Sequence, residues 1–123
     1  MKMPMSEILD RYTITKLKSE RTEEDVTEEL AAYESEIKAK NADPTAIQSF
    51  IDRLYKVNGD LWDVEGDIRK GVDMPLEEVG RLALKVRDLN CERNGVKAEV
   101  VDAFAEGFKE IKVNYTKVDY GRD

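Results

Sequence analysis

The sequence predicts an all-α fold, either a helical bundle or a long helical hairpin, on the strength of three observations. Apolar residues recur at intervals of three and four over most of the chain, which is the period of an amphipathic helix. Only 7 glycines and 3 prolines interrupt the 123 residues. Hydrophobic residues make up 41% and charged residues 38%, a composition typical of a folded domain rather than a disordered chain or a membrane span. We therefore expect a single all-α domain over residues 1–123.

Two helices are expected in the first third of the chain, at residues 6–20 and 22–40. Ser6 is a candidate N-cap for the first, because a serine side chain at that position accepts a hydrogen bond from a free backbone amide. Thr22 is followed three residues later by Asp25, a spacing that resembles a capping pair. This pair favours a break before Thr22 and a second helix after it.

Two longer helices are expected at residues 44–70 and 75–111, each introduced by a proline. Pro44 and Pro75 suit the first turn of a helix, where the missing backbone amide is not needed as a donor. Asp43 stands directly before Pro44 and is expected to cap the third helix.

The length of the fourth helix bears on the oligomeric state. A helix over residues 75–111 would be roughly 55 Å long, which is more than a compact domain of this size requires. Pairing of two chains would bury its apolar face, so we expect a homodimer. A bend at Asn94–Gly95 is the alternative, because it would let the chain fold back on itself. The tail at 112–123 alternates only weakly between polar and apolar residues and receives no assignment.

The formal charge of -7 is concentrated in one segment. Residues 20–36 contain eight acidic side chains and a single basic one, Arg21, so the rest of the chain is neutral. Leu30, Tyr33 and Ile37 recur here at helical spacing, which is typical of a solvated helix face. No stripe of lysine and arginine is visible, so we expect no nucleic-acid partner.

Histidine is absent and cysteine occurs once, so several classes of catalytic and metal site are excluded. Without histidine the chain lacks the commonest general base, the serine–histidine and cysteine–histidine nucleophile systems and the usual zinc ligands. A single cysteine forms no internal disulfide, and no secretory leader opens the chain. We therefore expect a cytoplasmic protein with no membrane partner and no cofactor.

The most specific signal is a set of polar residues in the apolar stripes of the third and fourth helices. Asn58 and Glu65 occupy positions where the spacing demands apolar residues, so both are expected to be partly buried. Arg93 interrupts the stripe of the fourth helix in the same way and is expected to face Glu65. Glu65 and Arg69 are four residues apart, in the order that favours an ion pair. The candidate ligand-binding residues are Asn58, Trp62, Glu65, Arg69, Asn90 and Arg93.

Two interpretations of this cluster stay open. In the structural one, a buried glutamate–arginine pair and an asparagine fix the register of the helices, and the protein is a purely structural oligomerisation module. In the functional one, Arg69 and Arg93 hold the carboxylate or phosphate of an anionic small molecule, and Trp62 stacks on a planar group. The protein would then be a small binding or accessory protein. Asp10 and Lys16 of the first helix are expected to be surface or capping charges, and the lesser alternative is that they join the same polar cluster.

A third interpretation is an enzyme. Four acidic residues of the fourth helix form two pairs: Glu77, Glu78, Glu99 and Asp102. The pattern resembles the paired carboxylates of the all-α nucleotide pyrophosphohydrolases, in which such residues hold magnesium against a pyrophosphate. The two pairs would share a metal ion only if the helix turned sharply at Asn94–Gly95 or if two chains met. Arg81 stands where a third carboxylate of that family's motif is expected.

The polar residues of these helices also follow a pattern that resembles a known protein family. Residues 58–69 follow the pattern N-x-x-L-W-x-x-E-x-x-I-R, and the segments 6–21, 54–71 and 76–100 as a whole resemble an uncharacterised family of short helical proteins, a domain of unknown function. The matching positions are Glu7, Asp10, Ile14, Lys18, Asn58, Leu61, Trp62, Glu65, Arg69, Asn90, Arg93 and Lys97. Members of the family are often found near genes for surface-polysaccharide or glycosyl transfer, and similar proteins occur in phages. The resemblance implies a supporting role in glycan or nucleotide-sugar metabolism, without naming a substrate.

Overall fold

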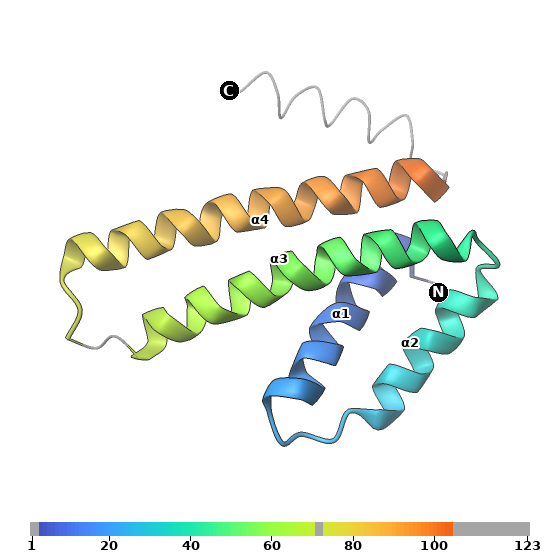
Figure 1. Ribbon diagram of the computed structural model, residues 1–123, viewed down its shortest axis with the longest axis horizontal. Helices are drawn as coiled ribbons and strands as arrows, with labels where there is room; N and C mark the ends of the chain where they lie inside the picture. The colour runs from blue at the N-terminus through green and yellow to red at the C-terminus, as the bar shows by residue number, and fades with distance from the viewer. Residues whose placement is uncertain (1–2, 71–72, 105–123) are drawn as a thin grey trace.

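The computed structural model describes residues 3–70 and 73–104, of which 86% are helical, with no strand in that part of the chain (Figure 1). The prediction of an all-α fold is confirmed. The helices are α1 (Met5–Arg21), α2 (Thr27–Ala39), α3 (Pro44–Lys70) and α4 (Leu76–Phe104). The stretch 105–111, where the fourth helix was expected to end, and the tail 112–123 lie outside the described residues. None of the four helices combines the length and apolar character that crossing a membrane requires.

The long helices α3 and α4 form an antiparallel hairpin, and the shorter helix α1 packs on one half of it (Figure 1). At 27 and 29 residues, α3 and α4 are about 40 and 43 Å long. Helix α1 packs against the other three helices, whereas α2 packs closely on α1 alone among the described helices. The hairpin is therefore covered on one half only.

Helix α1 begins earlier than its expected cap. Pro4 has extended backbone angles, and its carbonyl accepts the amides of Glu7 and Ile8 at 3.0 and 3.1 Å. Ser6 is already inside the helix and is 5% exposed, so its assignment as the N-cap was wrong. The reason is burial: α1 is surrounded by three helices and carries eight buried residues, which draws its first turn into the core.

The chain breaks between α1 and α2 as predicted, but Thr22 and Asp25 do not form a capping pair at the start of α2. Thr22 ends α1 instead of starting α2, because its hydroxyl donates to the Lys18 carbonyl at 2.7 Å and its backbone is extended. Asp25 accepts hydrogen bonds from the amide and the hydroxyl of Thr27 at 3.1 and 2.7 Å. Helix α2 therefore begins at Thr27 rather than at Thr22.

The corner between α2 and α3 matches its prediction. Asn41 has a φ of 52°, a left-handed conformation that asparagine tolerates better than most residues, and it ends α2. The Asp43 side chain then accepts the amide of Thr45 at 3.2 Å, as an N-cap does, and Pro44 is the first residue of α3.

Helix α4 runs without a break through Asn94–Gly95, so the alternative of a bend there is excluded. It begins at Leu76, one residue later than expected, and the Pro75 carbonyl accepts the amides of Glu78 and Val79. The chain is thus a long helical hairpin with two shorter helices attached.

The main core lies where α1 meets the hairpin. Its buried residues are Met5, Leu9, Ile47, Leu54, Val57, Val96 and Val100. Phe50 and Phe104 extend it with an edge-to-face contact, their ring centroids 6.0 Å apart. At the opposite end of the hairpin Leu76 is 88% exposed and Leu84 is 53% exposed, whereas Leu82 between them is buried.

Candidate functional sites

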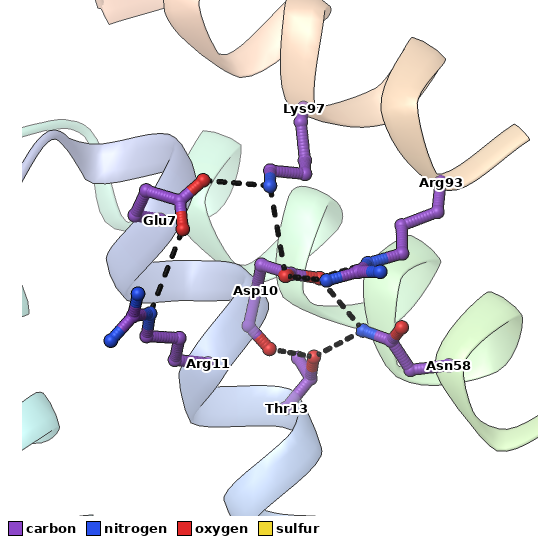
Figure 2. Close-up of polar contacts among 7 residues, drawn as sticks. All are labelled: Glu7, Asp10, Arg11, Thr13, Asn58, Arg93 and Lys97. Carbon is purple, nitrogen blue, oxygen red and sulfur yellow. Dashed lines mark hydrogen bonds and ion pairs between the residues drawn. The ribbon is translucent and has the colours of Figure 1, made fainter. Parts of the chain in front are cut away.

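A buried carboxylate on α1 is the centre of a polar network that joins three helices (Figure 2). Asp10 is 1% exposed. Arg93 of α4 reaches it with two parallel hydrogen bonds, from Nε to Oδ1 at 2.9 Å and from Nη2 to Oδ2 at 2.5 Å. Such a bidentate pair fixes the guanidinium in orientation as well as in distance.

Asn58 of α3 closes the network from the other side. Its Nδ2 donates to Asp10 Oδ1 and to Thr13 Oγ1, both at 3.0 Å. The Thr13 hydroxyl donates in turn to the Asp10 carbonyl at 2.8 Å. No buried side-chain nitrogen or oxygen of the described residues lacks a hydrogen-bond partner, so the network leaves none of its buried polar atoms free for a ligand.

The network reaches the surface through a second ion pair between α1 and α4. Lys97 Nζ lies 2.7 Å from Glu7 Oε2 and 3.8 Å from Asp10 Oδ2. Arg11 Nε approaches the other Glu7 oxygen at 3.6 Å (Figure 2). Two carboxylates of α1 thus face two cations of α4, and the opposed charges hold these helices in one register.

The electrostatics of Asp10 are a balance of opposing effects. Burial on its own raises the pKa of the Asp10 carboxyl, because the charged form loses hydration. Hydrogen bonds from Arg93 and Asn58, with the charges of Arg93 and Lys97, outweigh burial and hold that pKa below its ordinary value. The hydrogen bonds to Asp10 raise the pKa of Arg93, against the effect of burial. At neutral pH both groups are charged.

The expectation that Asp10 is a surface or capping charge was therefore wrong, whereas the lesser alternative holds for it, because Asp10 meets Asn58 and Arg93. Ser6, Asp10, Thr13 and Leu17 recur along α1 at helical spacing, and all are buried. A search for apolar periodicity alone passes over this stripe, because three of its four members are polar. The resemblance to the helical family does mark Asp10, together with Glu7 and Lys97.

The other predicted residues of the cluster do not meet around Arg93. Glu65 is exposed, and no hydrogen bond or ion pair joins it to Arg69 within the described residues. Its charge contributes to the raised pKa of Arg93, but as the weakest of several causes. Asn90 is half-buried and forms no hydrogen bond with the network in the described part of the chain. Near this level α1 reaches its C-terminal end, where Arg21 meets Asp63.

Trp62 and Arg69 lie together in a separate groove of about 430 Å³ at the C-terminal ends of α1 and α3. Its lining consists of Arg21, Trp62, Asp63, Gly66, Asp67, Arg69 and Lys70. Arg21 is paired with Asp63 at 2.6 Å. Within the described residues no ion pair engages Arg69 or Lys70. A Cβ atom at Gly66 would meet nothing within 4 Å, so space is open beside the indole.

The four acidic residues of the alternative magnesium site are separated by the unbroken helix. The interval from Glu78 to Glu99 corresponds to about 32 Å along α4, too far for one chain to hold a shared metal ion. Glu78 is paired with Arg81, and Glu99 with Arg53 through two hydrogen bonds at 2.9 and 2.8 Å. The described residues contain no group of three or more potential ligands placed to hold a metal.

Comparison of the chain with protein-family models, with curated proteins and with solved structures finds no match.

Proposed function

We propose that the protein is a small binding or accessory protein that takes up an anionic small molecule with a planar group in the groove at Trp62. The observation that carries this proposal is the meeting of a partly exposed indole with two cations, Arg69 and Lys70, that have no carboxylate partner among the described residues. An aromatic face and adjacent cations are the elements that recognise a planar ring bearing phosphate or carboxylate.

The ligand would lie against the indole of Trp62, in the space that Gly66 leaves open. Arg69 would contact the anion in bidentate fashion, and Lys70 would add a point charge. Asp63 is already neutralised by Arg21, so Asp67 is the one carboxylate of the lining that opposes an anion. Nucleotides and nucleotide sugars combine a planar ring with phosphate, and the resemblance noted above implies a role in that metabolism.

Asn58 and Arg93 have a supporting role in this proposal. Their polar atoms are engaged with Asp10 and Thr13, and they hold α1 on the hairpin. Because Arg21 at the end of α1 forms one wall of the groove, the network sets the position of that wall. In this proposal Asn58 and Arg93 take the structural role, and Trp62 and Arg69 take the binding role.

The test uses Trp62 as its own reporter, because it is the single tryptophan of the chain. We expect nucleoside diphosphates and nucleotide sugars to quench its fluorescence in a saturable way. The quenching of a free tryptophan analogue, measured in parallel, should not saturate. Replacing Arg69 with Gln removes a charge-assisted hydrogen bond, so the Kd should rise about tenfold or more.

Arg87→Gln is the matched control, since Arg87 is an exposed arginine of α4 that does not line the groove. It should leave the Kd within about twofold of that of the wild-type protein. Equal quenching in the wild-type protein and in Arg69→Gln would refute the anion site. The proposal would also be refuted if the quenching of Trp62 had the same concentration dependence as that of the free tryptophan analogue.

We further propose that two chains pair through α4 and that the protein acts in the cytoplasm. Leu76, Gly80 and Leu84 are four residues apart and share one face of α4, and both leucines are exposed. A Cβ at Gly80 would meet nothing within 4 Å, which leaves room for a close helix partner. The exposed free thiol of Cys91 supports a reducing compartment.

A further inference from the structure

The exposed face of α4 carries a short stripe that is symmetrical about one residue. Leu76, Gly80 and Leu84 follow one another at intervals of four residues, so they lie on one face of the helix. Both leucines are exposed, whereas Leu82 of the opposite face is buried. The order leucine, glycine, leucine is the same in both directions along α4. A second copy of the helix that runs the other way therefore presents the same pattern.

This symmetry suits a two-fold dimer of antiparallel helices. In such a dimer, if residue i of one chain lies opposite residue j of the other, then j also lies opposite i. Two copies of α4 centred on Gly80 place Leu76 opposite Leu84 of the partner subunit at both ends of the stripe. A Cβ at Gly80 would meet nothing within 4 Å in the single chain, so the centre of the stripe is open to the close approach of a second helix.

The charges beside the stripe are complementary in this arrangement. Glu77 and Arg81 each follow a stripe residue by one position, so both lie on the same side of it. In an antiparallel two-fold pair the equivalent sides of the two helices meet, which places Glu77 and Arg81 of the partner subunit about 3 Å apart along the helix axis. Arg81 is exposed, and Glu77 has no ion pair within the described residues. The pairing thus brings together opposite charges at two equivalent places.

Other ways of pairing the same face place it against charge. If the centre of symmetry moves two residues towards the C-terminus of α4, Leu76 lies opposite the partner's Asp88, and a move of four residues places it opposite the partner's Glu92. Both acidic residues are exposed. An in-register parallel pair places each Glu77 opposite its own copy and each Arg81 likewise, so like charges meet. The antiparallel pair centred on Gly80 avoids both conflicts.

We propose that two copies of this chain pair through α4 in antiparallel orientation, with the two-fold axis at Gly80. This inference rests on the pairing through α4 proposed above and adds its direction and its register. The contact lies on the half of the hairpin that α1 leaves open, so the two copies of α1 lie at opposite ends of the dimer (Figure 1).

Disulfide cross-linking tests the direction of pairing. In a Cys91→Ser background, Leu76→Cys and Leu84→Cys each place a single thiol at one end of the stripe. Neither variant on its own should give a cross-linked dimer on mild oxidation, because each thiol faces a leucine of the partner subunit. An equimolar mixture of the two variants should give one, because the two introduced thiols then lie opposite each other.

The wild-type protein provides an independent check through its own thiol. Cys91 is exposed and lies seven residues after Leu84, on the same face of α4. The two copies of Cys91 would be about 33 Å apart along the axis of the proposed dimer, so oxidation should not link them. An in-register parallel pair would instead bring these thiols together.

Charge reversal tests the register. Glu77→Lys and Arg81→Glu each bring like charges together in a dimer of identical chains, and each should raise the dimer Kd about tenfold. A mixture of the two variants restores opposite charges at both places and should dimerise like the wild-type protein. Glu92→Lys, an exposed change of equal charge outside the contact, should leave the Kd within about twofold. Light scattering measures the mass, and circular dichroism confirms that each variant is folded.

The outcomes separate this inference from the pairing on which it rests. A wild-type mass equal to one chain of 14.1 kDa would refute the pairing itself. With a dimeric wild-type protein, the antiparallel arrangement would be overturned if either cysteine variant cross-linked on its own or if their mixture did not cross-link. Equal weakening by Glu77→Lys and Glu92→Lys would overturn the register.

Discussion

At the scale of single residues, Asp10 contributes to the way the stability of the fold depends on pH. Its pKa in the folded protein lies below the ordinary value of about 3.8. The unfolded chain therefore binds a proton before the folded one does, and the ion pair stabilises the fold fully only above that ordinary value. We expect this stabilisation to be lost as the pH falls below about 4, and chemical unfolding between pH 7 and pH 3 measures it.

Asp10→Asn isolates this effect. Arg93 is 28% exposed and would lose its carboxylate, so we expect a loss of about 2–4 kcal/mol in the free energy of unfolding at pH 7. The difference from the wild-type protein should shrink on acidification. Glu99→Gln is the control: it removes a bidentate partner of Arg53 that is 55% exposed, at a cost of under about 1 kcal/mol. A constant difference from pH 7 to pH 3 would contradict the assignment.

At the scale of elements, α4 keeps its helix although it contains two glycines. Nothing lies within 4 Å of a Cβ built at Gly80 or at Gly95. A glycine in a helix interior costs up to about 1 kcal/mol relative to alanine. The absence of neighbours means that the described fold does not require either glycine for close packing.

We expect Gly95→Ala to raise the free energy of unfolding by up to about 1 kcal/mol and the Tm by a few degrees. Calorimetry or thermal circular dichroism measures the change. Ala83→Gly, an exposed position in the same helix, should lower the stability by a similar amount. A loss of stability in Gly95→Ala would instead indicate that another surface approaches the helix there.

At the scale of the whole molecule, one half of the α3–α4 hairpin is covered and the other is open. Helix α1 covers the core end, whereas Leu76 and Leu84 are exposed at the other end. The proposed homodimer would bury those leucines. Light scattering after size exclusion should then give about twice the chain mass of 14.1 kDa.

The double variant Leu76→Ser with Leu84→Ser removes the apolar contacts and should dissociate the dimer. Ala83→Ser, an exposed change beside Leu84, should leave it intact. A wild-type mass equal to one chain at micromolar concentration would rule out pairing through this face.

By itself the sequence determined the local structure of this protein. Periodicity identified the four helices, and Asp43–Pro44 placed the start of α3 to the residue, because capping and amphipathicity are short-range effects. It also marked Asn58 and Arg93 as polar residues on apolar faces. It misplaced the start of α2, since Thr22 can end one helix as readily as it begins the next.

Tertiary structure alone decided which groups those polar residues meet. Arg93 pairs with Asp10, 83 residues earlier in the chain, rather than with Glu65, and Asn58 reaches the same carboxylate across 48 residues. Those contacts depend on how α1 crosses the hairpin, which the packing of the shared core sets and no local spacing encodes. For the same reason the sequence did not reveal that Trp62 and Arg69 lie in a different site from Arg93. A groove between α2 and α3 likewise depends on how the helices pack, and local sequence does not predict it.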